Sequence, residues 1–384
     1  MKYKITDLFE LKMGKTPSRS NPNYWNGTNV WLSVSDLSSS GKYISCSKER
    51  ITEQAIDESK IQMIPKDTVV MSFKLSLGKV SITTHNMYTN EAIIAFVDKK
   101  SEKVDPSYLY YWCLSQNWEK YGNKAVMGVT LNKKTLTSLS IELPPYELQK
   151  RIVKRLDLLA NLLEAKNIQL QSLQQLVQSR FIEMFGDPIL NPKGWIQEEL
   201  SKYSLKISDG EHTSVPRVES GIPFLNAKHI LSDGEIDFSS ASFISEENHN
   251  RIFKRCNPEI NDILLTTTGT IGNTAIVKTE KEFSMDRGIT LIKIDKSRIN
   301  QFFLAQLLKM PSSQEWMRRN TTTATIGHLF LNKVRSFPTI IPSKSDQDDF
   351  SYFLDQITKS KLAIQKSIDE LETLKKKLMQ EYFG

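Results

Sequence analysis

Basic residues, small hydroxyl residues and aromatics occur together at several places in the chain, a combination suited to contacts with nucleic acid. Lysine and arginine can reach phosphates and the acceptor atoms of guanine, whereas serine, threonine and asparagine can bond to either phosphates or base edges. In the first half of the chain the candidates are Lys15, Thr16, Ser18, Arg19, Tyr24, Trp25, Lys74 and Lys79. In the second half they are His212, Thr213, Arg217, Lys228, His229, Thr268, Thr270, Arg318 and Arg319. Each cluster alone could be a solvated loop, but their recurrence at matched places favours binding.

The sequence lacks the residue patterns of several common catalytic sites. It has no GxxxxGK[ST] loop, no GxGxxG after a predicted strand and no HExxH, and its five histidines lack metal-ligand spacing. The GxxG at 269–272 is interpreted as a tight loop between strands, and His249, near Glu246 and Glu247, as part of a solvated turn. The LPPY at 143–146 is similar to the (Asn/Asp)-Pro-Pro-Tyr motif of amino-methyltransferases, but its leucine cannot accept a hydrogen bond. The sequence therefore predicts no catalytic residue, no cofactor-binding residue and no metal ligand.

Length and composition are those of a globular protein of two or three domains. The chain has 384 residues, of which 39% are hydrophobic and 25% charged, and its net charge of +7 is compatible with a polyanionic partner. Cys46, Cys113 and Cys256 are odd in number and far apart, which argues against a disulfide framework. The sequence has no run of about 18 apolar residues, so it predicts no transmembrane helix. It has no apolar segment near the start, so it predicts no secretory signal. A cytoplasmic protein without membrane contact is expected.

The chain contains two copies of one plan. Residues 172–186 (SLQQLVQSRFIEMFG) are similar to residues 370–384 (ELETLKKKLMQEYFG), an offset of 198. The same offset aligns Pro144 with Pro342, Gln149 with Gln347, Leu156 with Leu354 and Asp157 with Asp355; with small shifts, Gly14 matches Gly210 and Trp31-Leu32 match Phe224-Leu225. We expect a strand-rich domain at 1–143, a long helix at 144–186, a second strand-rich domain at 187–341 and a second long helix at 342–384.

Within each copy, short β-rich segments precede a long helix. The segments 68–73, 92–97, 263–267 and 290–294 are predicted strands, and 108–120 and 301–310 are predicted helices. A proline then precedes about 40 residues that contain no glycine or proline until the helix ends. The fold class predicted is α+β.

The two long helices carry a heptad pattern of apolar residues. Its members are Ile152, Leu156, Leu159, Leu163, Leu170, Leu173 and Val177 in the first helix and Leu354, Ile357, Ile364, Ile368, Leu371 and Leu378 in the second. Lys166, Arg180, Lys361 and Lys375 interrupt it. Because a tandem repeat already supplies two such helices, we expect them to pair with each other as an intramolecular antiparallel coiled coil. Pairing between two chains is the other possibility.

These motifs resemble the specificity subunit of type I restriction–modification systems. Gly14-Lys15-Thr16-Pro17-Ser18-Arg19 with Tyr24-Trp25 is similar to one common opening of the family, and Gly210-Glu211-His212-Thr213 followed by residues 221–225 to the other. Residues 143–152 (LPPYELQKRI) are similar to the start of its first conserved helix. The second copy departs from the pattern with Pro342-Ser343 in place of two prolines and Asp348-Asp349-Phe350 in place of a basic-apolar start.

The resemblance implies a non-catalytic DNA-recognition subunit. Each strand-rich domain would be a target-recognition domain that reads one half of a bipartite, asymmetric site in double-stranded DNA, and the helix pair would set the gap. Two modification subunits would supply S-adenosylmethionine-dependent adenine methylation, and restriction subunits would use ATP and Mg²⁺; this chain would hold no cofactor. The alternatives are a non-catalytic coiled-coil scaffold and a methyltransferase-associated DNA-binding protein without restriction activity.

Overall fold

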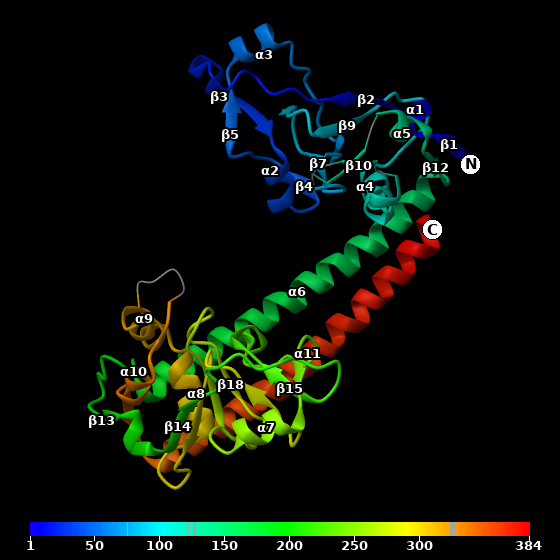
Figure 1. Cartoon of the computed structure of the whole chain (residues 1–384). Helices are drawn as coiled ribbons and strands as arrows, with labels where there is room; N and C mark the ends of the chain where they lie inside the picture. Colours follow the sequence, from blue (N-terminus) through cyan, green and yellow to red (C-terminus); the bar gives the residue numbers. More distant parts are fainter. Residues whose placement is uncertain (75, 122, 126–127, 132, 323–326) are drawn as a thin grey trace. The chain divides into compact units, whose positions relative to one another are not determined.

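The computed structural model describes the chain except residues 75, 122, 126–127, 132 and 323–326 (Figure 1). The chain divides into two compact units, one formed by Met1–Asn167 with Lys366–Gly384 and the other by Ile168–Gln365. Each unit contains one strand-rich domain together with a part of each long helix. Each unit is therefore described by itself.

The domain of the first unit alternates short strands with short helices. Its elements are β1 (Lys2–Lys4), α1 (Ile5–Leu8), β2 (Phe9–Met13), η1 (Pro22–Tyr24), β3 (Trp25–Leu32), α2 (Val34–Ser39), β4 (Tyr43–Ile44), β5 (Glu49–Ile51), α3 (Glu53–Ser59), β6 (Val69–Ser72), β7 (Val80–Thr83), β8 (Tyr88–Thr89), β9 (Ile93–Asp98), α4 (Pro106–Ser115), η2 (Trp118–Tyr121), β10 (Asn123–Ala125), β11 (Gly128–Thr130), α5 (Lys133–Ser138) and β12 (Ser140–Glu142). The main sheet has the order β2-β9-β6-β7-β4; smaller sheets are β5-β3-β8, β1-β12 and β10-β11. The pairs β3·β8 and β4·β7 are parallel and the others antiparallel.

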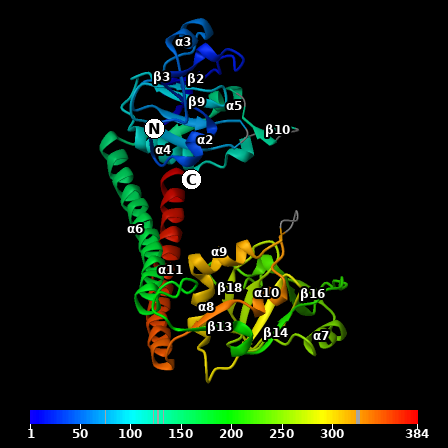
Figure 2. The same ribbon diagram turned by 90° about the vertical axis from the view of Figure 1, so that its left-hand side faces the viewer.

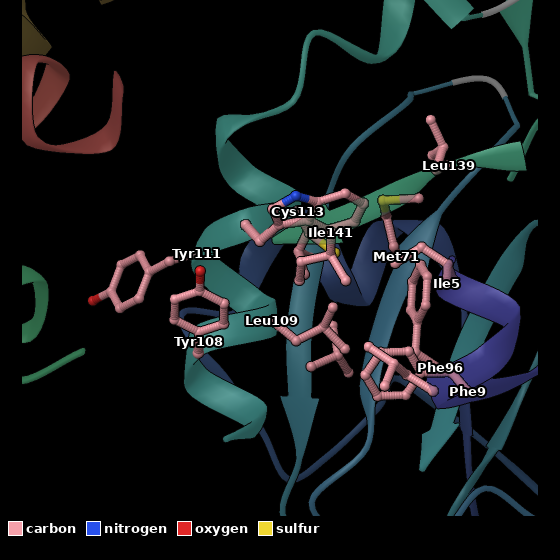
Figure 3. Close-up of a cluster of buried hydrophobic side chains, with 14 of the residues drawn as sticks. Ile5, Phe9, Met71, Phe96, Tyr108, Leu109, Tyr111, Cys113, Leu139 and Ile141 are labelled. Atoms are coloured by element: carbon pink, nitrogen blue, oxygen red, sulfur yellow. The ribbon is translucent and has the colours of Figure 1, made fainter. Parts of the chain in front are cut away.

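The core of this domain lies between its main sheet and α4. Figure 3 shows Leu109 and Cys113 of α4 on the side toward Met71 of β6 and Phe96 of β9, and these four side chains are buried. The strand residues 93–96 and 69–72 are all buried, so these two central strands are covered on both faces. Burying side chains of this size contributes about 1.5–3 kcal/mol each. The core therefore fixes the strand ends from which the loops leave.

The domain of the second unit repeats this plan. Its elements are β13 (Ile196–Glu199), η3 (Leu200–Tyr203), β14 (Ser204–Asp209), β15 (Ile222–Leu225), η4 (Ala227–His229), β16 (Ser242–Ile244), α7 (Glu246–Phe253), β17 (Ile263–Thr266), β18 (Thr274–Ile276), β19 (Ser284–Met285), β20 (Ile289–Ile294), α8 (Gln301–Lys309), α9 (Pro311–Arg319), α10 (Leu331–Arg335) and β21 (Pro338–Ile341). The sheets are β14-β20-β17-β18, β16-β15-β19 and β13-β21. The parallel pair β15·β19 joins Leu225 to Met285, as β3·β8 joins Leu32 to Thr89. The match of Leu32 with Leu225 predicted from sequence is confirmed.

Two long helices, α6 (Tyr146–Phe185) and α11 (Lys344–Phe383), follow the two domains (Figures 1 and 2). In the first unit the start of α6 lies beside the end of α11: the Arg155 guanidinium donates to the Tyr382 hydroxyl at 3.0 Å. In the second unit Phe181 of α6 packs on Phe350 of α11, with ring centroids 5.5 Å apart. In both units, then, the start of one helix meets the end of the other. The antiparallel intramolecular pairing is confirmed.

The predicted heptad seam also agrees with the burial of the side chains. Ile152, Leu156, Leu159, Val177, Ile357 and Ile368 are buried. The other predicted members, Leu163, Leu170, Leu173, Leu354, Ile364, Leu371 and Leu378, are half-buried. The interrupting Lys166, Arg180, Lys361 and Lys375 are half-buried as well, as their seam positions require.

One buried glutamine in each unit ties the domain to its long helix. Gln149 donates to the carbonyls of Pro144 and Lys103, both at 3.0 Å, and accepts from the Asp105 amide at 2.9 Å. Gln347 donates to the Pro342 carbonyl at 3.0 Å and accepts from the Asn300 amide at 2.8 Å. Because buried amides need such partners, each glutamine fixes the first turn of a long helix against the start of α4 or α8. The offset of 198 therefore has a structural counterpart.

Two sequence predictions need correction. The helix predicted at 108–120 ends at Ser115, because the Trp118 indole N–H bonds the Cys113 carbonyl at 2.8 Å and closes the last turn. His249 does not lie in a solvated turn: its ring is buried, 3.0 Å from the Ser284 hydroxyl and 3.2 Å from Glu282. The three cysteines are unbonded, in agreement with the sequence analysis.

Candidate nucleic-acid interface

In the first unit, three loop segments leave the main sheet at one edge. Strand pairing places Met13 opposite Ile94 and Ser72 opposite Ile93, so the end of β2, the end of β6 and the start of β9 coincide. The segments concerned are residues 14–21, the described residues of 73–79 (all but 75), and residues 90–92. The Lys15 amide donates to the Thr89 carbonyl at 2.9 Å and fixes the first segment. Predicted candidates lie on two of the three.

The second unit has the same edge. Asp209 pairs with Thr290 and Thr266 with Ile289, so residues 210–221, 267–273 and 286–288 leave the sheet together. The Glu211 amide donates to the Met285 carbonyl at 2.8 Å, which is the same bond as that of Lys15, 196 residues further along the chain. The backbone framework of the two edges is therefore repeated.

A glycine permits the closest backbone approach at each edge. A Cβ on Gly14 would lie 2.0 Å from the Thr89 carbonyl oxygen, and one on Gly210 would lie 2.2 Å from that of Asp286. Neither distance can accommodate a side chain. The sequence match of Gly14 with Gly210 thus reflects a steric requirement in both domains.

The hairpin loop between β6 and β7 matches the loop between β17 and β18. The Gly78 amide donates to the Ser72 carbonyl at 3.0 Å, and the Gly272 amide to the Thr266 carbonyl at 2.9 Å. Both glycines have positive φ, 76° and 94°. The hydroxyl at the start of each loop accepts from the backbone at its end: Ser72 from Lys79 at 3.0 Å and Thr266 from Asn273 at 2.9 Å. The GxxG is a tight loop between strands, as predicted.

The two loops present different side chains on this shared backbone. In the first unit they are Lys79, which is exposed, and Lys74, which is half-buried with its ammonium 5.3 Å from the Phe73 ring. In the second they are Thr270, which is exposed, and Thr268, whose hydroxyl lies 2.6 Å from Nδ1 of His328. One loop is therefore cationic and the other a neutral hydrogen-bonding surface.

The other candidates of the first unit are organised around Arg19. Its guanidinium lies 3.9 Å from the Trp25 ring centroid and bonds both oxygens of Glu49, and this hydrogen bonding lowers the pKa of the Glu49 carboxyl. The Trp25 indole donates to the Ser18 carbonyl at 3.1 Å, and the Tyr24 hydroxyl bonds Glu58. We call Arg19, Trp25 and Glu49 the Arg19 corner. In this corner the guanidinium is stacked on an aromatic ring and is already paired with a carboxylate.

Lys15, Thr16 and Ser18 lie on the segment that precedes this corner. The Lys15 ammonium donates to the Ser59 carbonyl at 2.8 Å, and the Thr16 hydroxyl donates to Glu91. The Ser18 hydroxyl lies 2.8 Å from that of Ser20. The segment is thus ordered by its own contacts, with Lys15 and Ser18 exposed.

In the second unit, the segment after β14 carries three exposed candidates. His212 Nε2 lies 2.8 Å from an Asp209 oxygen, and Thr213 donates to Glu211 through its hydroxyl at 2.6 Å. The Arg217 guanidinium lies 4.2 Å from the Phe224 ring centroid. All three lie on the segment that leaves the same sheet edge.

Lys228 and His229 differ from each other in burial. Lys228 is exposed, whereas the His229 ring is 1% exposed, accepts from the Asn226 amide at 2.8 Å and lies 3.2 Å from the Ser240 carbonyl. Both ring nitrogens are therefore used inside the domain. His229 is withdrawn as a nucleic-acid contact; it holds the turn that carries Lys228.

Arg318 and Arg319 lie at the end of α9 and are strongly exposed. Both hydrogen-bond to Glu315, and these bonds lower the pKa of the Glu315 carboxyl to about 2. Exposed pairs of this kind contribute little to stability because water and salt screen them. Both arginines can therefore turn to another anion at small cost.

Two residues at the second edge were missed by the sequence analysis. Arg287 is exposed on the segment before β20, and His328 bonds Thr268. The pKa of His328 is lowered by its burial and then by the charge of Arg287. The offset of 196 that relates Gly14 to Gly210 aligns Arg287 with Glu91, the residue that accepts from Thr16 at the first edge. This alignment is the sequence signal that could have identified Arg287.

The described residues contain no group of three or more histidine, cysteine, aspartate or glutamate side chains placed to hold a metal ion. In the part of the chain that the structure describes, no helix combines the length and the apolar character that a membrane span needs.

Comparison with known proteins identifies the family. Residues 1–175 and 212–373 match the type I restriction modification DNA specificity domain. The type I restriction enzyme MjaIX specificity subunit of Methanocaldococcus jannaschii is 28% identical over 265 residues, which are 63% of this chain and 60% of that protein. The type I restriction enzyme EcoBI specificity subunit of Escherichia coli is 23% identical over 265 residues, or 62% of this chain and 56% of that protein. The aligned part thus covers less than two thirds of either relative.

Solved structures agree in fold. The S subunit of a type I restriction-modification system from M. genitalium matches with a TM-score of 0.54 and 16% identity, over 100% of this chain and 96% of that one. A structure described under complex assembly and conformational transition of the type I R-M system matches with a TM-score of 0.64 and 16% identity, over 100% and 97%. Because the family match covers more than half of the sequence, this chain belongs to the type I restriction modification DNA specificity family.

Proposed function

We propose that this chain is the DNA-recognition subunit of a type I restriction–modification complex, in which each domain reads one half of a bipartite, asymmetric site. One observation carries the proposal. Each domain presents three loop segments at the corresponding edge of its own main sheet, and the backbone of these segments is repeated while their side chains differ. Reading of base pairs requires fixed backbone and variable side-chain chemistry, since each base pair offers a distinct pattern in the major groove. Two different surfaces on one scaffold would give an asymmetric site.

The two edges offer both kinds of contact that DNA recognition needs. Exposed cations, such as Lys79 in the first unit and Arg287 in the second, suit phosphates or guanine acceptors. Exposed hydroxyls, such as Thr270, suit base edges or phosphates. The net charge of +7 is small for a chain of this length, so local clusters must supply the attraction to the duplex.

Partner subunits would supply the chemistry. Two modification subunits would bind S-adenosylmethionine and methylate adenine, restriction subunits would use ATP and Mg²⁺, and this chain would hold none of these cofactors.

The long helices expose apolar side chains suited to docking: Leu158, Leu162 and Leu374 in the first unit are 60%, 41% and 43% exposed. In the second unit Leu176, Tyr352 and Leu362 are 48%, 70% and 73% exposed. Exposed apolar groups of this kind are typical of protein interfaces. The helix pair would also set the length of the unread gap.

A methylome tests this proposal. Cells carrying this chain with its neighbouring modification subunit are compared with cells lacking only this chain. A bipartite methyladenine motif that disappears with the chain is the expected result. Unchanged methylation, combined with the absence of salt-dependent DNA binding by the reconstituted complex, would instead support a scaffold. Methylation without cleavage of unmodified DNA would support the methyltransferase-associated alternative.

A further inference from the structure

The second unit contains a small polar pocket between its domain and the two long helices. The pocket has a volume of about 180 Å³, which is below the roughly 300–1,000 Å³ of pockets for drug-sized ligands. Its walls are α6, α8, α9, α11 and residues 232–233 and 272–274. It is lined by two lysines, Lys309 and Lys361, by one carboxylate, Asp233, and by amide and hydroxyl side chains that include Gln174 and Asn273. Space and chemistry both suit a group of only a few atoms.

The two lysines lack a carboxylate partner. Lys309 donates only weakly, to the Asp233 backbone carbonyl at 3.5 Å. Two acids act on Lys309 through their charge: Glu235, which is paired with Lys278 at 2.6 Å, and Asp233, which lies in the pocket wall. Among the described residues, no carboxylate forms an ion pair with Lys309 or Lys361. Two cations therefore share the pocket with a single carboxylate, Asp233, which accepts from the Glu235 amide at 3.0 Å.

Burial makes the charged form of both lysines costly. Burial lowers the pKa of Lys309 to about 8, with Asp233 opposing the shift and Lys361 and Lys278 adding to it. Burial also lowers the pKa of Lys361, against the charge of Asp233. An unpaired, partly desolvated ammonium group gains most from a charge-assisted hydrogen bond. An anion in the pocket would relieve both lysines at once.

Two glycines shape the walls for these side chains. A Cβ on Gly234, whose φ is 96°, would lie 2.3 Å from the Lys309 ammonium. A Cβ on Gly272 would lie 2.2 Å from the Gln314 amide oxygen, and that amide donates to the carbonyls of Gly272 and Leu308 at 3.0 and 2.7 Å. The lysine therefore lies against backbone in a place that a larger residue would close.

The first unit shows the same kind of junction with its anion built in. There Lys42, which follows Gly41 in the turn before β4, pairs with Asp157 of α6 at 2.6 Å, and Tyr111 of α4 donates to the same oxygen at 2.5 Å. The match of Trp31 with Phe224 aligns Gly41 with Gly234. Where the first unit closes the junction between domain and helix with an aspartate, the second leaves two lysines facing a pocket.

We infer that the pocket lined by Lys309 and Lys361 binds a phosphate-class oxyanion, which completes the junction between the second domain and the long helices. The source is either free phosphate or a phosphodiester of the DNA backbone. The chemistry at the pocket is the same for both. Tetrahedral oxyanions offer several acceptors at once, so one group can satisfy two lysines and the amides of Gln174 or Gln178.

The first test uses inorganic phosphate on the full chain, in complex with its partner subunit if the chain alone is insoluble. Binding is measured by calorimetry and by the unfolding midpoint, at pH 7 with chloride replaced at constant ionic strength. Lys309→Gln and Lys361→Gln should each weaken phosphate binding by about tenfold or more. Lys359→Gln is the matched control, because Lys359 is an exposed lysine of α11, the helix of Lys361, and is paired with Asp355. This variant should bind phosphate as tightly as the unchanged chain does.

The second test separates the two sources. If the phosphodiester is the ligand, Lys309→Gln and Lys361→Gln weaken DNA binding equally for all sequences and reduce the slope of log affinity against log salt by about one each. If free phosphate is the ligand, they weaken phosphate binding by about tenfold or more and leave the DNA affinity unchanged. If neither phosphate binding nor DNA affinity responds to these substitutions, the inference is wrong. The phosphate arm contains no DNA, so it stands whether or not the proposed function holds.

Discussion

The two domains agree in backbone and disagree in charge at corresponding positions. With the offset of 196 that relates Gly14 to Gly210, Lys15 corresponds to Glu211, Thr16 to His212 and Glu91 to Arg287. The first and last of these pairs exchange a positive for a negative charge. The backbone bonds at these positions nevertheless match within 0.1 Å, at 2.9 Å for Lys15 and 2.8 Å for Glu211.

This difference separates residues that build the edge from residues that face outward. Those that build it are constrained in both domains by backbone contacts, as Gly14, Gly210, Ser72 and Thr266 are. Those that face outward, such as Lys79 and Thr270, are exposed and differ in type. A scaffold of this kind can change what it recognises without changing how it folds.

The largest effect should come from breaking the shared framework. Gly14→Ala would place a Cβ 2.0 Å from a backbone oxygen that cannot move independently of β8, so strain of roughly 1–3 kcal/mol or more is expected. Urea unfolding measures it. Gly41→Ala is the matched control in the same domain, since nothing lies within 4 Å of its Cβ, and it should change stability by less than about 0.5 kcal/mol. Equal stabilities of the two variants would contradict the close approach.

Sequence reasoning found the repeat, the helices and most of the edge, because each left a periodic or repeated signal. The seam residues are spaced by the heptad, and Gln149 and Gln347 share one offset. It could not find the burial of His229 or His249, since a histidine next to polar residues has the same local pattern in a core and in a loop. It also missed the pocket at Lys309, whose lining comes from six separate segments that only the fold brings together.

A smaller effect should distinguish the two hairpin loops. Lys79→Gln should weaken binding to every DNA sequence and lower the salt slope by about one, because it removes a phosphate-directed charge. Thr270→Val keeps the side-chain shape and removes the hydroxyl, so it should relax preference at one base pair by about 1–3 kcal/mol if it reads a base edge. Binding of the reconstituted complex to a duplex library at several salt concentrations measures both.

Two controls make this comparison specific to the sheet edge. Lys66 is exposed but precedes β6, and so lies at the end of that strand opposite to Lys79. Thr279 follows β18 and lies beyond the end of that strand opposite to Thr270. Lys66→Gln and Thr279→Val should leave affinity, salt slope and sequence preference unchanged. A loss with Lys66→Gln as large as that with Lys79→Gln would show that general charge, rather than the edge, carries the binding.

The smallest effect should distinguish the two arginine sites. Arg19 is stacked on Trp25 and bonded to both oxygens of Glu49, so Arg19→Ala removes part of the corner that orders the first edge. Arg318 is 73% exposed, and its guanidinium bonds Glu315, three residues earlier on α9. Arg318→Ala should therefore weaken DNA binding by a factor of about 3–10 at low salt, with the difference vanishing at high salt and no change in the unfolding midpoint. Arg19→Ala should lower both the midpoint and the affinity. If Arg318→Ala shifts the unfolding midpoint as far as Arg19→Ala does, then Arg318 also stabilises the fold, and the two arginine sites do not differ in this respect.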